Sequence, residues 1–287
     1  MEPDWWFGRR TSIEQLVEQI RVAARSALPL SMVRMGDGEG AFLSKTSRSD
    51  PATDGVLAVW FGDARSSLRQ RDVDVIRSLL RNAAIGADIL GLPTRFQVHL
   101  RSAYADLLHV MSDLPLSSKL SFVDANAHWY LQLSGGLDRI LRGQPSVGIV
   151  GCRDLGDRVK DFFEISEVRS YLVRGEAVAP GPVLDAHWPG GFSDTLNRLE
   201  PARPGEIFLV GAGGLGKAYC TELRRKGAVA LDIGSVLDGW AKIDSRVRLG
   251  RWPALFAMEH GQSVAAKGLR SALDDACREV NIVGAVY

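Results

Sequence analysis

The sequence has few cysteines, no long apolar run and almost no net charge. Cys152, Cys220 and Cys277 are its three cysteines, and they stand far apart. Their number and spacing fit neither a disulfide framework nor a zinc site, which agrees with a reducing cytoplasm. No stretch approaches the roughly 18 apolar residues of a membrane-spanning helix. The first ten residues also lack the apolar segment of a secretory signal. We therefore expect a cytoplasmic protein that is not transmembrane; peripheral attachment at the inner membrane face stays open.

The charge balance excludes two classes of partner. Thirty-five basic residues stand against 34 acidic ones, a net charge of +1. A nucleic-acid surface or a polybasic membrane face needs a clear excess of positive charge, so neither is expected. The composition, 46% hydrophobic and 24% charged, is ordinary for a globular protein. Its 287 residues allow one large domain or two small ones.

Apolar strand-like runs alternate with stretches of helical period. Thr11 and Glu14 have the spacing of a capping box, and apolar residues then recur at helical spacing through residue 24. Short buried strands are predicted near 31–35, 120–124, 145–151, 166–173, 206–210 and 228–231. Helices are predicted over 63–81, 96–111, 131–141, 155–163, 192–199, 217–226 and 262–280. Residues 44–55 are predicted to form a loop, either a lid or an ordinary surface segment. The alternation indicates an α/β sheet.

The chain is organised around an acidic, glycine-rich segment, residues 31–40. A short apolar strand there breaks into Gly36-Asp-Gly-Glu-Gly40. If the segment is extended, Asp37 and Glu39 project on the same side, because alternate residues of a strand share a face. Two carboxylates suit Mg²⁺ or Mn²⁺, which takes its other ligands from water and substrate phosphates. Arg34 adds a forked positive charge for a phosphate. The alternative is a solvated acidic turn without a ligand.

A second glycine-rich segment follows the strand at 206–210. It begins at Gly211, includes Gly213, and leads into a helix at Lys217; the next strand ends at Asp232. This order matches the dinucleotide fingerprint, in which a helix N-terminus binds a diphosphate. NAD(P) and other diphosphates remain alternatives on this basis. Only about 55 residues follow Asp232, too few for a second nucleotide-binding half. We therefore expect this segment to close a sheet built earlier, with its glycine loop near the acidic loop.

Several motifs together resemble one known family. The run from Arg34 to Glu39 looks like the R-x-G-D-G-E signature of the GT-D-type glycosyltransferases, and 208–220 and 227–240 look like the C-terminal motifs of bacterial members. Residues 124–128 and 151–154 also fit, so the resemblance covers about 11–248. Met35 stands where members often have an aromatic residue. The resemblance implies one Rossmann-like α/β domain over residues 1–250, a sheet flanked by helices. The remaining residues, 251–287, are predicted to be a helical tail packed on it.

The resemblance implies a metal-dependent glycosyltransferase that moves a sugar from a nucleoside-diphosphate donor to a glycan, protein or lipid-linked acceptor. It places the cation motif on Asp37 and Glu39, with Mn²⁺ or Mg²⁺ as cofactor, and a UDP-sugar is the favoured donor. His187 or Asp185, in a proline- and glycine-rich loop, is the candidate base for the acceptor hydroxyl. The residues expected around the donor are Arg34, Gly36, Gly38, Asn126, His128, Gly211, Gly213, Lys217, Asp232, Gly234 and Ser235. Capping the following helix is the competing role for Asn126.

Three further expectations stay open at this point. The main alternative function is an NAD(P)-dependent oxidoreductase using Gly211–Gly216. A non-catalytic nucleotide-sugar sensor is a third class. A homo-oligomer is possible through the N-terminal aromatics Trp5, Trp6 and Phe7 or through the tail, although both patterns also suit packing within one chain.

Overall fold

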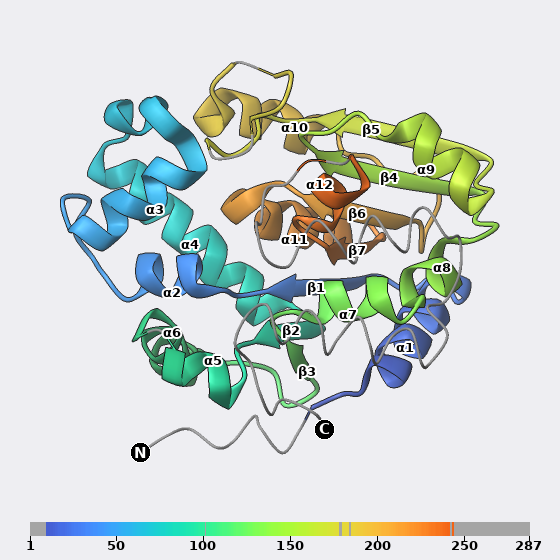
Figure 1. Cartoon of the computed structure of the whole chain (residues 1–287), viewed down its shortest axis with the longest axis horizontal. Helices are drawn as coiled ribbons and strands as arrows, with labels where there is room; N and C mark the ends of the chain where they lie inside the picture. Colours follow the sequence, from blue (N-terminus) through green and yellow to red (C-terminus); the bar gives the residue numbers. More distant parts are fainter. Residues whose placement is uncertain (1–9, 101, 178–179, 184, 242, 244–287) are drawn as a thin grey trace.

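The computed structural model describes residues 10–100, 102–177, 180–183, 185–241 and 243 of the chain (Figure 1). The predicted tail at 251–287, with its helix at 262–280, lies outside these residues, as do Cys277 and the N-terminal aromatics. Within the described part, no helix is long and apolar enough to cross a membrane.

The centre of the molecule is a seven-stranded sheet in which every described pairing is parallel. The strands are β1 (Leu30–Arg34), β2 (Ile89–Leu92), β3 (Ser121–Asp124), β4 (Ser146–Gly151), β5 (Glu167–Leu172), β6 (Ile207–Gly211) and β7 (Val229–Asp232). Their spatial order is β3-β2-β1-β7-β6-β4-β5. The last of the described strands therefore lies between the first and the sixth. This confirms the predicted α/β class and the expectation that the C-terminal segment closes an earlier sheet.

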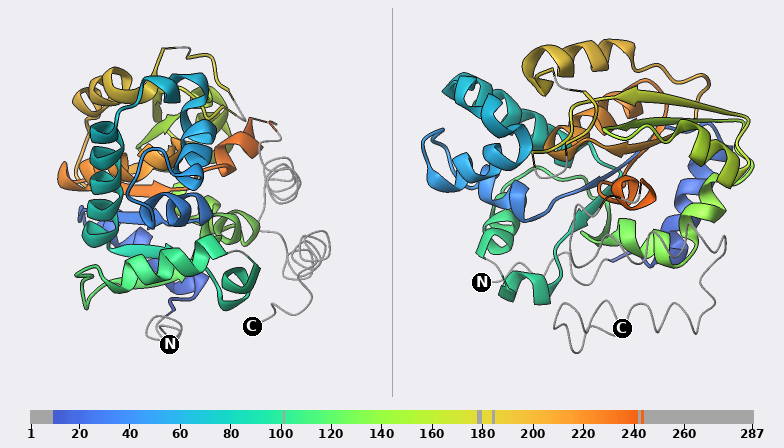
Figure 2. Two further views of the ribbon diagram at one scale, coloured as in Figure 1. Left: turned by 90° about the vertical axis from the view of Figure 1, so that its left-hand side faces the viewer. Right: turned by 45° about the horizontal axis from the view of Figure 1, so that its top comes forward.

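Helices cover both faces of the sheet (Figure 2). One face carries α2 (Asp37–Leu43), α3 (Pro51–Phe61), α4 (Gln70–Gly86), α6 (Ser102–Ser112), α10 (Phe192–Arg198) and α11 (Gly216–Arg225), with α5 (Arg95–Leu100) preceding α6. The other carries α1 (Ile13–Arg25), α7 (Ala127–Leu133), α8 (Gly136–Leu141), α9 (Gly156–Phe163) and α12 (Val236–Trp240). Connections that step toward β3 use the first face, and those that step toward β5 use the second. Right-handed crossovers between parallel strands require this arrangement.

The first described helix begins one residue later than the sequence indicates. Ser12 is the N-cap of α1: its hydroxyl accepts from the Gln15 N–H, and the Gln15 side chain accepts from the Ser12 N–H. Thr11 and Glu14 have the same spacing, but the Thr11 N–H donates to the Phe122 carbonyl at 2.8 Å. This contact with β3 keeps Thr11 outside the helix, so tertiary pairing decides between two equivalent capping boxes.

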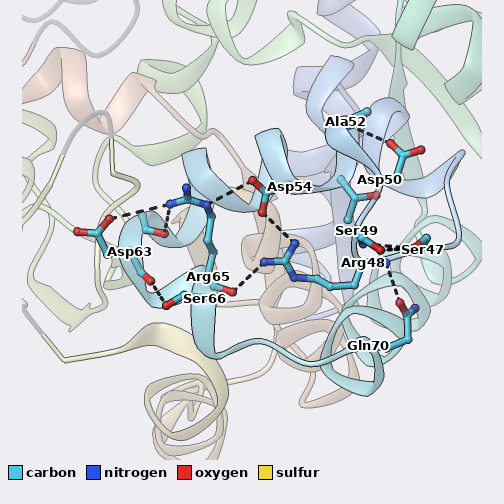
Figure 3. A network of polar contacts seen from close by, with 12 residues as sticks. Ser47, Arg48, Ser49, Asp50, Ala52, Asp54, Asp63, Arg65, Ser66 and Gln70 are labelled. Carbon is cyan, nitrogen blue, oxygen red and sulfur yellow. Dashed lines mark hydrogen bonds and ion pairs between the residues drawn. The ribbon is translucent and has the colours of Figure 1, made fainter.

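The predicted loop at 44–55 is shorter than expected and is held by polar contacts (Figure 3). Asp50 caps α3 by accepting from the Ala52 N–H, so the helix begins at Pro51. Arg48 pairs with Asp54 at 2.9 Å, donates to the Arg65 carbonyl at 3.0 Å, and its N–H donates to Gln70 at 2.7 Å. Arg65 belongs to a 3₁₀ helix, η2 (Gly62–Ser67). These contacts favour a fixed segment over a lid.

Candidate functional site

The carboxyl ends of β1, β7 and β6 lie next to one another. After β1 and β6 the chain passes to α2 and α11 on one face, and after β7 it passes to α12 on the other. In open α/β sheets, ligands bind outside the strand ends at such a switch in direction, and the region at the ends of β1, β7 and β6 is called the crevice here. Lys217 of α11 reaches Glu39 of α2 at 2.8 Å. The structure thus confirms that the second glycine loop lies near the acidic segment.

Asp232, at the end of β7, is bound mainly by Arg34 of β1. The Arg34 Nη2 lies 3.0 Å from Asp232 Oδ1, and its Nε donates to the Asp232 carbonyl at 2.7 Å. Arg34 Nη1 donates to the Ala125 carbonyl at 3.0 Å and lies 2.8 Å from His128 Nδ1. Every polar group of this guanidinium is therefore bonded within the protein, and His128 is buried beside it.

Lys217 completes the buried charge network. Its ammonium lies 2.8 Å from Glu39 Oε1 and 3.4 Å from Asp232 Oδ2. Burial disfavours the charged amine, but the two carboxylates outweigh it and raise the pKa of Lys217 to about 12. Burial likewise opposes the ionisation of Asp232, yet Arg34 and Lys217 hold the pKa of that carboxyl below its usual value. Two cations and two anions thus balance in the crevice.

The acidic pair does not have the predicted extended geometry. Asp37 begins α2, and residues two apart in a helix point about 200° apart, so the side chains diverge. Glu39 turns back to accept from the Gly36 N–H at 2.7 Å, and Asp37 Oδ1 accepts from the Gly38 N–H at 3.0 Å. The expectation of two carboxylates on the same side of a strand is wrong. Acidic residues in a first helical turn are stabilised by the exposed N–H groups there, which explains the local fold.

The residue types still suit a hard cation, although the two side chains diverge. Asp37 and Glu39 offer carboxylate oxygens, which Mg²⁺ and Mn²⁺ prefer. Among the described residues no group of three His, Cys, Asp or Glu side chains could hold a metal. A cation here would need further oxygen ligands from substrate phosphates and water. Because Glu39 Oε1 lies against the Lys217 ammonium, a cation would have to share this oxygen with Lys217 or displace Lys217 from it.

Trp60 of α3, which no sequence motif singles out, lies against both glycine-rich segments. A Cβ on Gly214 would stand 2.7 Å from its ring, and one on Gly38 would stand 3.8 Å away. Gly214 is therefore required for close packing on the indole. Trp60 is only 8% exposed, and its ring also packs on Phe42. A tryptophan in an apolar helical run has the pattern of an ordinary core residue, so only the tertiary structure shows that Trp60 contacts both glycine-rich segments.

The remaining predicted glycines serve close packing. A Cβ on Gly234, whose φ is +47°, would stand 2.5 Å from Arg34 Nη2. A Cβ on Gly211 would stand 2.8 Å from the Gly234 carbonyl oxygen. Gly213 has φ +57°, and its Cβ position lies 2.8 Å from Glu176 Oε1. Ser235 lies at the N-terminus of α12 without capping it through its side chain. The turn at 232–235 thus passes directly along Arg34.

Asn126 lies at the end of β3, beside this network. It is the N-cap residue of α7, but its side chain makes no capping bond, so the competing structural role is not observed. Its N–H donates to Asp124 Oδ1 at 2.8 Å. Burial raises the pKa of Asp124, although the Asn126 N–H and Arg10 act against the shift. Asp124 is a buried polar residue of this region that was not predicted as a site residue.

His187 is at a different place, in the loop between β5 and α10. It begins a short irregular turn (His187–Gly191), in which Trp188 has the extended φ and ψ of −111° and 140°. Its Nε2 lies 2.8 Å from the Tyr219 hydroxyl of α11, and the ring is buried. Burial, aided by Arg174, lowers the pKa of His187 to about 4. His187 and Asp185 line a cavity of about 750 Å³ beside α10. The structure groups these two residues together, apart from the charge network.

Comparison with known proteins identifies the family. The pattern of the GT-D fold-like domain matches residues 11–240. The chain belongs to this family. A solved structure with a TM-score of 0.52 and 13% identity is a selenomethionine-substituted domain of unknown function 1792. Another, with a TM-score of 0.49 and 15% identity, is described as this domain having a distinct glycosyltransferase fold. Each comparison covers 81% of both chains. No curated protein matches.

Membership of the GT-D-like family confirms the recognition made from the sequence motifs and the predicted fold class. The match begins just before α1 and ends at the last residue of α12, so it contains all seven strands. It supports a glycosyltransferase.

Proposed function

We propose that this GT-D-like protein is a metal-dependent glycosyltransferase that uses a nucleoside-diphosphate sugar, with a UDP-sugar favoured. The observation that carries the proposal is the Lys217–Glu39 contact at 2.8 Å, which joins the acidic segment to the second glycine loop. Both segments lie at strand ends, where the chain direction switches. The crevice combines carboxylates, a glycine loop and a helix N-terminus, the groups that proteins use to hold a metal-bound diphosphate.

Different residues of the crevice are proposed to bind different parts of the donor. The glycine loop and the first turn of α11 offer backbone N–H groups to the diphosphate. Arg34 and Lys217 supply positive charge on the buried side of the crevice, and both side chains are positioned by ion pairs with Asp232. Asp37 and Glu39 would hold Mn²⁺ or Mg²⁺. The bound cation would stabilise the negative charge that grows on the leaving nucleoside diphosphate. Asn126 and the turn at 232–235 border the same crevice and are proposed to contact the nucleoside.

Sugar transfer requires an acceptor hydroxyl from a glycan, a glycoprotein or a lipid-linked sugar. The acceptor oxygen bonds to the anomeric carbon as the bond from that carbon to the diphosphate oxygen breaks, and the nucleoside diphosphate leaves with the electron pair. The hydroxyl proton passes to a base. His187, with a pKa of about 4, is a weak base at neutral pH. Asp185 is exposed on the same cavity and is the other proposed base.

The oxidoreductase alternative is less well supported. In a dinucleotide fold the acid after the second strand binds the ribose hydroxyls. Here Asp232 is 3% exposed and is bonded to Arg34 and Lys217. A ribose would therefore compete with two buried ion pairs. Beyond β7 the described chain adds only α12, so a second nucleotide-binding half does not follow in the described part.

The test is nucleotide binding with and without a divalent cation. Thermal unfolding is measured with UDP and UDP-glucose, each with Mn²⁺, with Mg²⁺ and with a chelator. At a hundredfold excess over Kd the ligand should stabilise the protein by about 2.7 kcal/mol. Asp37→Asn should abolish the metal dependence and leave the unfolding of the free protein unchanged. Asp161→Asn, an exposed acid on α9, is the matched control. Equal binding in Mn²⁺ and in chelator contradicts the proposed metal role.

A further inference from the structure

The cavity beside α10 is separate from the charge network and has a defined floor and rim. It holds about 750 Å³ and lies between the end of β5, the loop before α10 and α10 itself. In Figure 1 this part lies at the top of the molecule, above α11. His187 and Thr195 are buried in the floor with Val173, whereas Asp185, Asp194 and Asn197 are exposed at the rim. A volume of this size accommodates a small organic ligand.

The floor and one wall are held rigidly. His187 bonds Tyr219 of α11 at 2.8 Å, and the two rings are stacked 5.9 Å apart. Trp188 donates from its indole N–H to Asp72 of α4 at 3.3 Å and packs 5.4 Å from the ring of Phe192. Trp188 is half-buried and lines the cavity. A fixed, partly exposed indole is a flat apolar surface at the side of a polar rim.

The charges around the cavity point to a neutral ligand. Arg174 and Arg198 line it together with Asp185 and Asp194, so positive and negative charges are equal in number. A diphosphate would meet two carboxylates here, in contrast to the glycine loop. Carboxylates accept from hydroxyls, guanidinium groups donate to them, and amides do both, all in fixed planes. The C–H face of a sugar ring packs on an aromatic surface. Together these groups suit a hydroxyl-rich, uncharged ring.

The cavity borders the proposed donor crevice. Arg174 lines the cavity, and Glu176 follows two residues later. The Glu176 carboxylate lies against Gly213 of the glycine loop, because a Cβ added to Gly213 would stand 2.8 Å from Glu176 Oε1. Two residues of extended chain span about 7 Å. The segment that lines the cavity at Arg174 therefore reaches the glycine loop two residues later.

We propose that this cavity is the acceptor subsite and that it takes the terminal ring of a neutral saccharide on Trp188, with Asp194 and Asn197 binding its hydroxyls. The proposal rests on the proposed function, because only a transferase has an acceptor. The saccharide site itself stands on the geometry of the cavity.

The test is saturation-transfer NMR on the full chain without nucleotide, with cellobiose, maltose and N,N′-diacetylchitobiose as separate probes. At least one probe should receive saturation on its ring protons. The signal should fall at least fivefold in the double variant Asp194→Ala/Asn197→Ala and in Trp188→Ala. Asp157→Ala/Asp161→Ala on α9 is the matched control and should keep it. The double variant changes only exposed side chains, so it tests the site even if loss of the indole disturbs folding.

The outcomes separate this inference from the proposed function. Absence of saturation for all three probes, or an unchanged signal in the double variant, overturns the saccharide site. Displacement of the saccharide by UDP with Mn²⁺ also overturns it, because it would make the cavity part of the donor site. Saccharide binding by a protein that shows no UDP-dependent thermal shift supports the saccharide site and counts against the transferase proposal alone.

Discussion

Two carboxylates and two cations share the buried space where β1, β7 and β6 end. Removing a charge from water costs several kcal/mol, and only a close partner offsets this cost. Glu39 and Asp232 have such partners in Lys217 and Arg34, at 2.8 and 3.0 Å. Each charged side chain of the network therefore has a partner of opposite charge, and the loss of one side chain leaves an unpaired charge in the interior.

Lys217→Met should destabilise the protein by about 3–5 kcal/mol, the usual cost of leaving a buried charge without its partner. Glu39 and Asp232 would both lose a cation, since Lys217 contacts both. Chemical denaturation followed by circular dichroism measures the change. Lys160→Met, on the exposed side of α9, is the control and should shift stability by less than about 0.5 kcal/mol. Equal stability of the two variants would show that the network contributes nothing.

His187 makes stability depend on pH. Its pKa is about 4 in the folded protein and about 6.5 in the unfolded chain, so the unfolded chain binds more protons between these values. The contribution of His187 is fully present above about pH 6.5 and is lost as the pH falls toward 4. At 1.36 kcal/mol per unit, the loss amounts to about 3 kcal/mol.

The free energy of unfolding, measured between pH 4 and 7, checks this behaviour. His187→Gln should flatten the profile in that range, whereas His109→Gln, at an exposed position of α6, should leave it unchanged. If the His187→Gln profile keeps the slope of the unsubstituted protein, another group is responsible for it.

At the residue scale, sequence reasoning identified the members of the crevice better than their orientation. The sequence predicts Arg34, Lys217 and Asp232 at one site because the segment with the second glycine loop is expected to close the sheet near the acidic loop, and the family resemblance implies the same site. The acidic pair was misjudged, since the spacing of Asp37 and Glu39 fits a strand face or a helix turn equally well. The partner of each charge depends on tertiary contacts, and no spacing in the sequence contains that information.

At the scale of elements, α3 supports the two glycine-rich segments by placing Trp60 against both. Gly214→Ala would put a methyl group 2.7 Å from the Trp60 ring, so the loop or the indole must move. We expect a loss of about 1–3 kcal/mol, the usual cost of overpacking. UDP binding should weaken as well, since this loop is proposed to hold the diphosphate.

A matched substitution and a rescue test this contact. Gly55→Ala, at an exposed position within α3 with open space around its Cβ, should raise the free energy of unfolding by up to about 1 kcal/mol through helix propensity. Trp60→Leu combined with Gly214→Ala should destabilise less than the sum of the two single changes, because the smaller side chain makes room. Strict additivity would mean that the two residues do not interact.

A glycine pair divides one of the predicted helices. The helix predicted over 131–141 is divided: α7 ends at Leu133, and α8 begins at Gly136 after Gly135, whose φ is +69°. A left-handed residue cannot continue an α-helix, so the glycine pair ends one helix and begins another. The sequence predicts six of the seven described strands and misses β2. Most of the six are continuous apolar runs, which are typical of a parallel sheet that is buried on both faces, whereas the edge strand β5 carries polar residues.

At the scale of the whole molecule, the fold depends on β7, which is the last described strand in sequence and lies in the middle of the sheet. β7 pairs with β1 through Met32 and Leu231 and with β6 through Leu209 and Leu231. The order of the strands could not be predicted from periodicity, because any parallel arrangement would show the same apolar runs. The shortage of residues after Asp232 was the observation that indicated a closing strand.

Truncation tests this dependence and the predicted domain boundary together. A chain of residues 1–227 lacks β7 and leaves β1 and β6 without their common neighbour, so it should not show cooperative unfolding. A chain of residues 1–250 contains every described strand and both apolar clusters, which are complete by Trp240. It should unfold cooperatively with a Tm within a few degrees of the full chain, and UDP with Mn²⁺ should still raise that Tm. If 1–250 fails to fold, residues 251–287 are part of the folding unit, and the division predicted from the sequence is wrong. If 1–227 folds, the closing role of β7 is wrong, because the sheet would then be stable with its middle strand missing.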